Sequence, residues 1–124
     1  MATVELTKEN FEQTILDNDV VIVDFWAEWC APCRSFAPTY ELVSEKHPSI
    51  VFGKINTEAQ RELAGHFGIR SIPTLMIFKE QIVIFSQAGS LPESAIEDII
   101  AKAEALDMDV VRQKIEDQKK NGQG

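Results

Sequence analysis

The fold is decided by the stretch Val20-Val21-Ile22-Val23-Asp24-Phe25-Trp26-Ala27-Glu28-Trp29-Cys30-Ala31-Pro32-Cys33. Six of its first eight residues are β-branched or aromatic, with little alternation, which is typical of a central strand covered on both faces; Asp24 is the anomaly. The chain's only two cysteines follow, three positions apart and ahead of a segment with helical spacing. A thiolate at the first turn of a helix is favoured by unpaired backbone N–H groups and by the helix dipole. The pair is therefore a candidate redox centre or a pair of metal ligands.

Working outward, the composition fits one globular domain of 124 residues with 44% apolar side chains. The formal net charge of −8 argues against a general nucleic-acid binder and against attraction to anionic membranes. The amino terminus lacks the basic and apolar regions of a secretory signal. The longest apolar run, Val20 to Val23, is too short to span a bilayer. We therefore expect a protein of the reducing cytoplasm.

Hydrophobic periodicity predicts the element order βαβαβαββα. The expected strands are 4–6, 20–27, 50–56, 74–78 and 82–86, and the expected helices are 7–16, 33–46, 60–67 and a segment from Pro92 onward. Strands joined through helices should be parallel and the final hairpin antiparallel, which gives a mixed sheet with helices on both faces.

Local features refine this prediction. Thr7 is the expected N-cap of the first helix. Pro38 is expected to kink the second helix without ending it. A three-residue loop, Lys79-Glu80-Gln81, is expected to close the hairpin. Residues 107–124 are expected to form a short appended helix with a frayed end.

The cysteine motif, together with Asp24-Phe25-Trp26-Ala27 before it and Ile72-Pro73-Thr74 and Gly89 after it, resembles the thioredoxin family over roughly residues 3–106. The resemblance implies an α/β thioredoxin fold: a mixed five-stranded sheet flanked by four helices, here with a short C-terminal helical extension. It divides the chain into a thioredoxin domain, 1–106, and an extension, 107–124.

The resemblance also implies a protein disulfide reductase. Cys30 would attack a substrate disulfide, and the more enclosed Cys33 would resolve the mixed disulfide. Asp24 would be a buried carboxylate whose pKa is raised by desolvation and which accepts the proton of Cys33. Lys54 would lie near Asp24 and tune it.

An apolar docking rim for clients is implied as well. Pro73 matches the family's cis-proline opposite the cysteines, beside an exposed backbone at Ile72 that can pair with an extended client segment. We call the following residues the docking rim: Trp29, Ala31, Pro32, Ile72, Pro73, Ala88 and Gly89. Trp26 is expected to have a structural role in the core.

The implied partners are disulfide-containing client proteins and a thioredoxin reductase that draws electrons from NADPH. The chain itself would be a monomer that binds no cofactor and carries only the redox-active disulfide. Two departures from the family pattern stand out. Ala31-Pro32 replaces the familiar Gly-Pro, which leaves the redox potential open, and Glu80-Gln81 replaces a frequent Asn-Gly at the hairpin.

Two alternatives compete with the reductase. Zinc needs about four ligands, and besides the cysteines only His47 and His66 remain, with 18 residues between them, so no metal site is expected. The chain could instead act as a binding or chaperone-like module in a larger assembly, attached through an amphipathic helix in residues 107–124.

Overall fold

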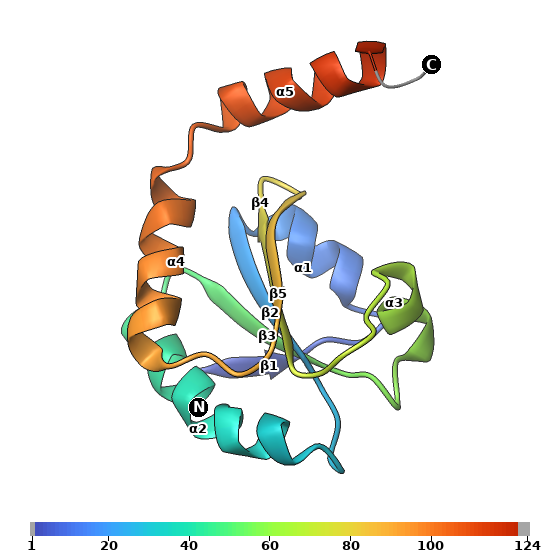
Figure 1. Cartoon of the computed structure of the whole chain (residues 1–124), viewed down its shortest axis with the longest axis vertical. Coiled ribbons are helices and arrows are strands. Elements are labelled where there is room, and N and C mark those ends of the chain that lie inside the picture. Colours follow the sequence, from blue (N-terminus) through green and yellow to red (C-terminus); the bar gives the residue numbers. More distant parts are fainter. Residues whose placement is uncertain (1, 122–124) are drawn as a thin grey trace.

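One five-stranded mixed sheet organises residues 2–121, the part of the chain that the computed structural model describes (Figure 1). In chain order the elements are β1 (Thr3–Glu5), α1 (Phe11–Asp17), β2 (Val20–Trp26), α2 (Ala31–Lys46), β3 (Val51–Asn56), α3 (Arg61–His66), β4 (Thr74–Lys79), β5 (Ile82–Ala88), α4 (Glu93–Ala105) and α5 (Met108–Asn121). The strand order is β1-β3-β2-β4-β5. Strands β1, β3 and β2 are parallel, whereas β4 is antiparallel to β2 and β5. The predicted mixed sheet is confirmed.

Strand β2 lies at the centre of this sheet, between β3 and β4. Only its last residue, Trp26, is partly exposed. Even-numbered side chains such as Ile22 pack with α2 and α4, and odd-numbered ones such as Val23 pack with α1 and α3. Figure 1 shows these two helix pairs on opposite sides of the sheet. Asp24 therefore falls on the face that α2 and α4 cover, among apolar neighbours.

The first helix begins later than predicted, because Asn10 holds a turn ahead of it. The Thr7 backbone N–H donates to the Oδ1 of Asn10 at 2.7 Å, and the Asn10 side-chain amide donates to the Glu5 carbonyl at 3.1 Å. Helix α1 starts at Phe11, with Asn10 in the N-cap position. The prediction of Thr7 as N-cap was wrong, because the hydrogen bonds of the Asn10 side chain hold the residues before Phe11 in a turn.

Helix α2 begins at Ala31, two residues before the predicted start at Cys33. Pro32 lies in its first turn, where a backbone N–H has no partner within the helix. The helix continues through Pro38 to Lys46, which confirms that this proline does not end it. The cysteine motif thus crosses the N-terminus of α2.

The β4–β5 hairpin is tighter than the predicted three-residue loop. Lys79 is the last residue of β4, and the turn contains only Glu80 and Gln81, with φ values of 49° and 71°. Lys79 is 7% exposed, so its predicted place in a turn was wrong. Its Nζ donates to three backbone carbonyls at the end of α4: those of Ala103, Glu104 and Leu106, at 2.8, 3.0 and 3.1 Å. This buried ammonium ties the hairpin to the C-terminal end of α4.

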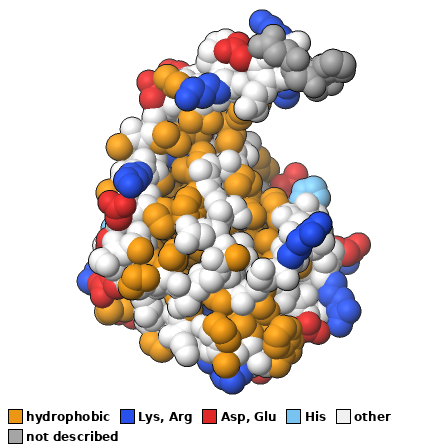
Figure 2. Space-filling model, in the orientation of Figure 1, with side chains coloured by type: hydrophobic (Ala, Val, Ile, Leu, Met, Phe, Trp, Pro, Cys, Tyr) orange, Lys and Arg blue, Asp and Glu red, His pale blue; other side chains and the backbone are white. Residues whose placement is uncertain are grey.

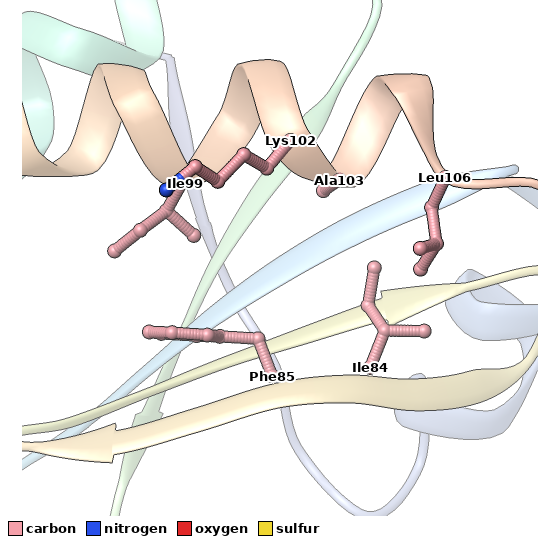
Figure 3. A pocket seen from close by; sticks show the side chains of 6 residues that line it. All are labelled: Ile84, Phe85, Ile99, Lys102, Ala103 and Leu106. Carbon is pink, nitrogen blue, oxygen red and sulfur yellow. The ribbon is translucent and has the colours of Figure 1, made fainter.

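The edge strand β5 carries a bulge where its register to β4 shifts beside Ile84. As a result the consecutive side chains of Ile84 and Phe85 both lie between β5 and α4 (Figure 3). They line a shallow groove of about 250 Å³ with Ile99, Lys102, Ala103 and Leu106. Figure 2 shows hydrophobic side chains spread over this face of the molecule, with charged side chains mostly around its margin.

Helix α5 stands off the sheet beyond the end of α4 (Figure 1). Its first residue, Met108, is buried, and Arg112 pairs with Glu80 of the hairpin turn. The predicted appended helix is confirmed, while the frayed end predicted after it falls partly on 122–124, outside the described residues. Within the described part of the chain, no helix has the length and apolar character needed to cross a membrane.

Candidate active site

Cys30 and Cys33 form a disulfide across the N-terminus of α2, with their Cα atoms 5.2 Å apart. Cys30 is the N-cap residue, and its Sγ accepts a hydrogen bond from the Cys33 backbone N–H at 3.2 Å. The same sulfur lies 3.7 Å from the carbonyl oxygen of Ile72. The cysteines are 4% and 3% exposed, so the predicted difference in enclosure is marginal in this oxidised state.

Asp24 is buried on the face of β2 that α2 covers. The residue is 1% exposed, and neither carboxylate oxygen has a hydrogen-bond partner within residues 2–121. Burial raises the pKa of Asp24 from 3.8 to about 7, and the nearby charge of Lys54 acts in the opposite direction. The predicted upward direction is confirmed, and the carboxyl changes its protonation near neutral pH.

Lys54 lies beside Asp24 on the neighbouring strand β3. The parallel register pairs these two residues, so their side chains share a face of the sheet. The Nζ of Lys54 is 4.7 Å from the centroid of the Trp26 ring. Trp26 is two residues beyond Asp24, and alternation along β2 puts both on the same face. The contact between Lys54 and Trp26 was not predicted from the sequence, although alternation along β2 already placed Trp26 on the same face as Asp24.

Trp26 is only partly buried, which corrects its predicted place in the core. It packs against a small cluster formed by Ala27, Cys30 and Cys33, here called the cysteine cluster. Ile72 packs against the same cluster. Trp26 therefore contacts both the cysteine cluster and Lys54.

The docking rim is assembled from three separate segments. Trp29 and its neighbours adjoin Cys30 in sequence, and Ile72 reaches the cysteine cluster through packing. The Ile72–Pro73 peptide bond is cis, as the resemblance implied. The Gly89 backbone N–H donates to the Pro73 carbonyl at 2.8 Å, which places the end of β5 beside this proline.

The members of the docking rim differ in exposure. Trp29 is 66% exposed, making it the most prominent apolar side chain beside the disulfide. Ile72 is half-buried and Pro73 is buried, so Pro73 offers little surface to a partner. The exposed remainder of the rim consists of Ala31, Pro32, Ala88 and Gly89.

Arg34, which sequence reasoning did not single out, spans the turn that carries Trp29. Its Nη1 donates to the Glu28 carbonyl at 2.5 Å, and its backbone N–H donates to the Cys30 carbonyl at 3.1 Å. Arg34 thereby connects the end of the loop to the second turn of α2. Within residues 2–121, no group of three His, Cys, Asp or Glu side chains is placed to hold a metal ion.

Comparison with known proteins gives the family. The family model described as Thioredoxin matches residues 2–102. This chain belongs to the thioredoxin family. Putative thioredoxin 2 of Streptomyces coelicolor is 59% identical over 117 residues, which cover 94% of this chain and 87% of that protein. Thioredoxin of Porphyra purpurea is 41% identical over 104 residues, covering 82% and 97% respectively.

Solved thioredoxins share the fold. Plasmodium falciparum thioredoxin superimposes with a TM-score of 0.74 at 33% identity, covering 81% of this chain and 97% of that one. A mutant thioredoxin from Halobacterium salinarum gives a TM-score of 0.77 at 30% identity, covering 85% and 92%. With its Cys-x-x-Cys disulfide, this thioredoxin is a thiol–disulfide oxidoreductase with protein disulfide reductase activity. The alternative of a binding or chaperone-like module is not favoured.

Proposed function

We propose that Cys30 is the attacking thiol and Cys33 the resolving thiol in the reduction of client disulfides. The Cys30 thiolate attacks one sulfur of the client disulfide. A Cys30–client S–S bond forms, the client S–S bond breaks, and one client sulfur leaves as a thiolate. Cys33, once deprotonated, attacks the Cys30 sulfur and releases the second client sulfur. The client gains two electrons, and the Cys30–Cys33 disulfide is left.

The observation that carries this assignment is the 3.2 Å hydrogen bond from the Cys33 backbone N–H to the Cys30 Sγ. In the reduced enzyme the same N–H would stabilise a negative sulfur on Cys30. The N-cap position also lies at the positive end of the α2 dipole. Cys33 lies within the first turn and is not at the cap. The two thiols are therefore unequal, and Cys30 is the better nucleophile.

Asp24 is proposed as the proton acceptor for Cys33. Its pKa of about 7 lets the carboxyl both take up and release a proton near neutral pH. It lies on the sheet face covered by the helix that carries Cys33. Lys54 favours the charged form of Asp24 and thereby tunes this step.

Clients would dock on the rim around Cys30. Trp29 supplies exposed apolar area, and the Ile72 carbonyl lies 3.7 Å from the Cys30 sulfur. A client segment lying along Ile72 would therefore present its own disulfide to Cys30. Main-chain pairing of this kind recognises an extended shape rather than particular side chains, which suits many different clients.

Electrons would come from NADPH through a partner thioredoxin reductase, so the chain itself needs no group beyond its disulfide. We place this electron transport in the cytoplasm, in cell redox homeostasis, with the protein acting as a monomer. We further propose 1–106 as the catalytic domain and 107–124 as an extension. The family match to residues 2–102 and the end of α4 at Ala105 support that division.

Two single-cysteine variants test the assignment: each is reduced with dithiothreitol, separated from the dithiothreitol and then mixed with an oxidised model protein as client. Cys33→Ser should form a lasting mixed disulfide with the client, because the resolving thiol is gone. Cys30→Ser should form none and should not reduce the client. Mass spectrometry identifies the linked cysteine. A Cys30→Ser variant that captured the client as efficiently as Cys33→Ser would overturn the assignment.

A further inference from the structure

The Trp26 ring links the disulfide region to the Lys54–Asp24 pair. Trp26 packs against the cysteine cluster. The Lys54 ammonium lies 4.7 Å from the centroid of the Trp26 ring, within the range of a cation–π interaction. Because Asp24 and Trp26 lie on the same face of β2, the ring and the carboxyl both adjoin the Lys54 side chain.

The Lys54 side chain could instead extend into water, and the Trp26 ring opposes that conformation. Lys54 is half-buried on β3, and a long lysine side chain readily turns its charged end into water. Within the described residues, Asp24 forms no hydrogen bond that would hold the ammonium in place. Among residues 2–121, the ring of Trp26 is the group that lies against the Lys54 ammonium.

We propose that Trp26 is a positioning residue: its ring holds the Lys54 ammonium near Asp24 and thereby sets how readily Asp24 accepts a proton. The catalytic consequence rests on the proposed role of Asp24 in activating Cys33. The positioning of Lys54 does not rest on that role, because it concerns only the electrostatic effect of the ammonium on the Asp24 carboxyl. Trp26 would thus couple packing around the disulfide to the acid–base group behind it.

Two other groups adjoin Asp24 from the elements packed against it. Strand β4 pairs the apolar Leu75 with Asp24. Helix α2 contributes Tyr40, whose phenol pKa is raised first by burial and then by Asp24. Within residues 2–121, Lys54 is the one cation that acts on Asp24, so moving its ammonium should be visible in the titration of this carboxyl.

The test is a double-mutant cycle on the titration midpoint of Asp24 in the oxidised protein, where the cysteines do not titrate. The carboxyl carbon of Asp24 is followed by NMR across pH in the wild type, Trp26→Leu, Lys54→Met and the double variant. Trp26→Leu should raise the midpoint by about half a pH unit, because an ammonium released toward water favours the charged carboxylate less. Lys54→Met should raise it by at least as much.

The decisive comparison is the effect of the tryptophan substitution in the two backgrounds. We expect Trp26→Leu to have little effect once Lys54 is methionine. An equal rise with and without Lys54, or no rise in either, would overturn the proposal, because the ring would then act only through packing. Trp26→Phe keeps an aromatic face that binds the ammonium more weakly, so it should raise the Asp24 midpoint by less than Trp26→Leu does, and only when Lys54 is present. This variant replaces Trp26→Leu in the test if the leucine variant does not fold.

The pH dependence of client reduction separates this proposal from the proposed function. If the midpoint moves as expected and the rate profile moves with it, both stand. If the midpoint moves and the rate profile does not, Trp26 positions Lys54 as proposed and the role of Asp24 as proton acceptor fails.

Discussion

Replacing Asp24 with asparagine should stabilise the oxidised protein by an amount that grows with pH. The pKa of Asp24 is about 7 in the folded protein and 3.8 when unperturbed. Between these values the native state holds a proton that the unfolded chain has lost, so stability falls as pH rises through this window. At about 1.4 kcal/mol per pH unit, the charged carboxylate lowers the free energy of unfolding by about 4 kcal/mol at pH 9. Asparagine removes the titration and keeps the shape.

The assay is urea unfolding of the wild type and Asp24→Asn, followed by circular dichroism at pH values from 4 to 9. The stability difference between the two proteins should increase by about 4 kcal/mol from pH 4 to pH 9, mostly between pH 4 and pH 7. Using the change in this difference cancels any constant effect of burying an amide. Asp98→Asn, at an exposed carboxylate on α4, is the matched control and should show no such trend. A flat difference between the Asp24→Asn and wild-type curves would refute the reasoning, because Asp24 would then titrate alike in both states.

Three further substitutions follow from the structure. Lys79→Met should lower the free energy of unfolding, measured in the same urea assay, by about 2 kcal/mol, because three carbonyls at the end of α4 lose their donor. The control Lys102→Met, at an exposed site, should change the free energy of unfolding by no more than about 0.5 kcal/mol. Gln81→Gly should raise the free energy of unfolding by about 1 kcal/mol, because glycine adopts the observed φ of 71° without steric cost; a lower urea midpoint would contradict this. Met108→Ala should weaken the docking of α5 by about 2 kcal/mol and speed limited proteolysis between α4 and α5 at least tenfold, whereas Val110→Ala, at an exposed position, should leave the cleavage rate unchanged.

Much of the fold could be read from residue patterns. The β-branched and aromatic run of β2, interrupted only by Asp24, and the helical spacing of α2 predicted both elements. A strand covered on both faces and an amphipathic helix both leave strong signals in the sequence. The errors lie at the ends of elements. The start of α1 depends on a hydrogen bond that the Asn10 side chain accepts from the Thr7 backbone. The length of the hairpin turn depends on Lys79, whose ammonium hydrogen-bonds to the end of α4 while the residue stays in β4.

Part of the site could likewise be predicted from the sequence. Cys30 and Cys33 could be singled out because the chain's only two cysteines follow a buried strand and lie three positions apart at the start of a helix. The role of Asp24 was implied by the resemblance to the family and stays a prediction. The contact between Trp26 and Lys54 was not foreseen, since it joins two strands that are separated by helix α2 in the chain. The role of Lys79 at the end of α4 was missed for the same reason: its three partners are 24 to 27 residues away.

The sequence by itself determined that a buried strand leads into two cysteines at the start of a helix, because this information is local and periodic. Only the tertiary structure decided what surrounds them. The parallel register of β2 and β3 puts Lys54 beside Asp24, and the loop before β4 brings the Ile72 carbonyl to the Cys30 sulfur. Burial of Asp24, with no hydrogen-bond partner among the described residues, then moves its pKa to about 7. Desolvation and charge proximity are properties of the packed chain, so the residue pattern alone could not give the pKa of this carboxyl.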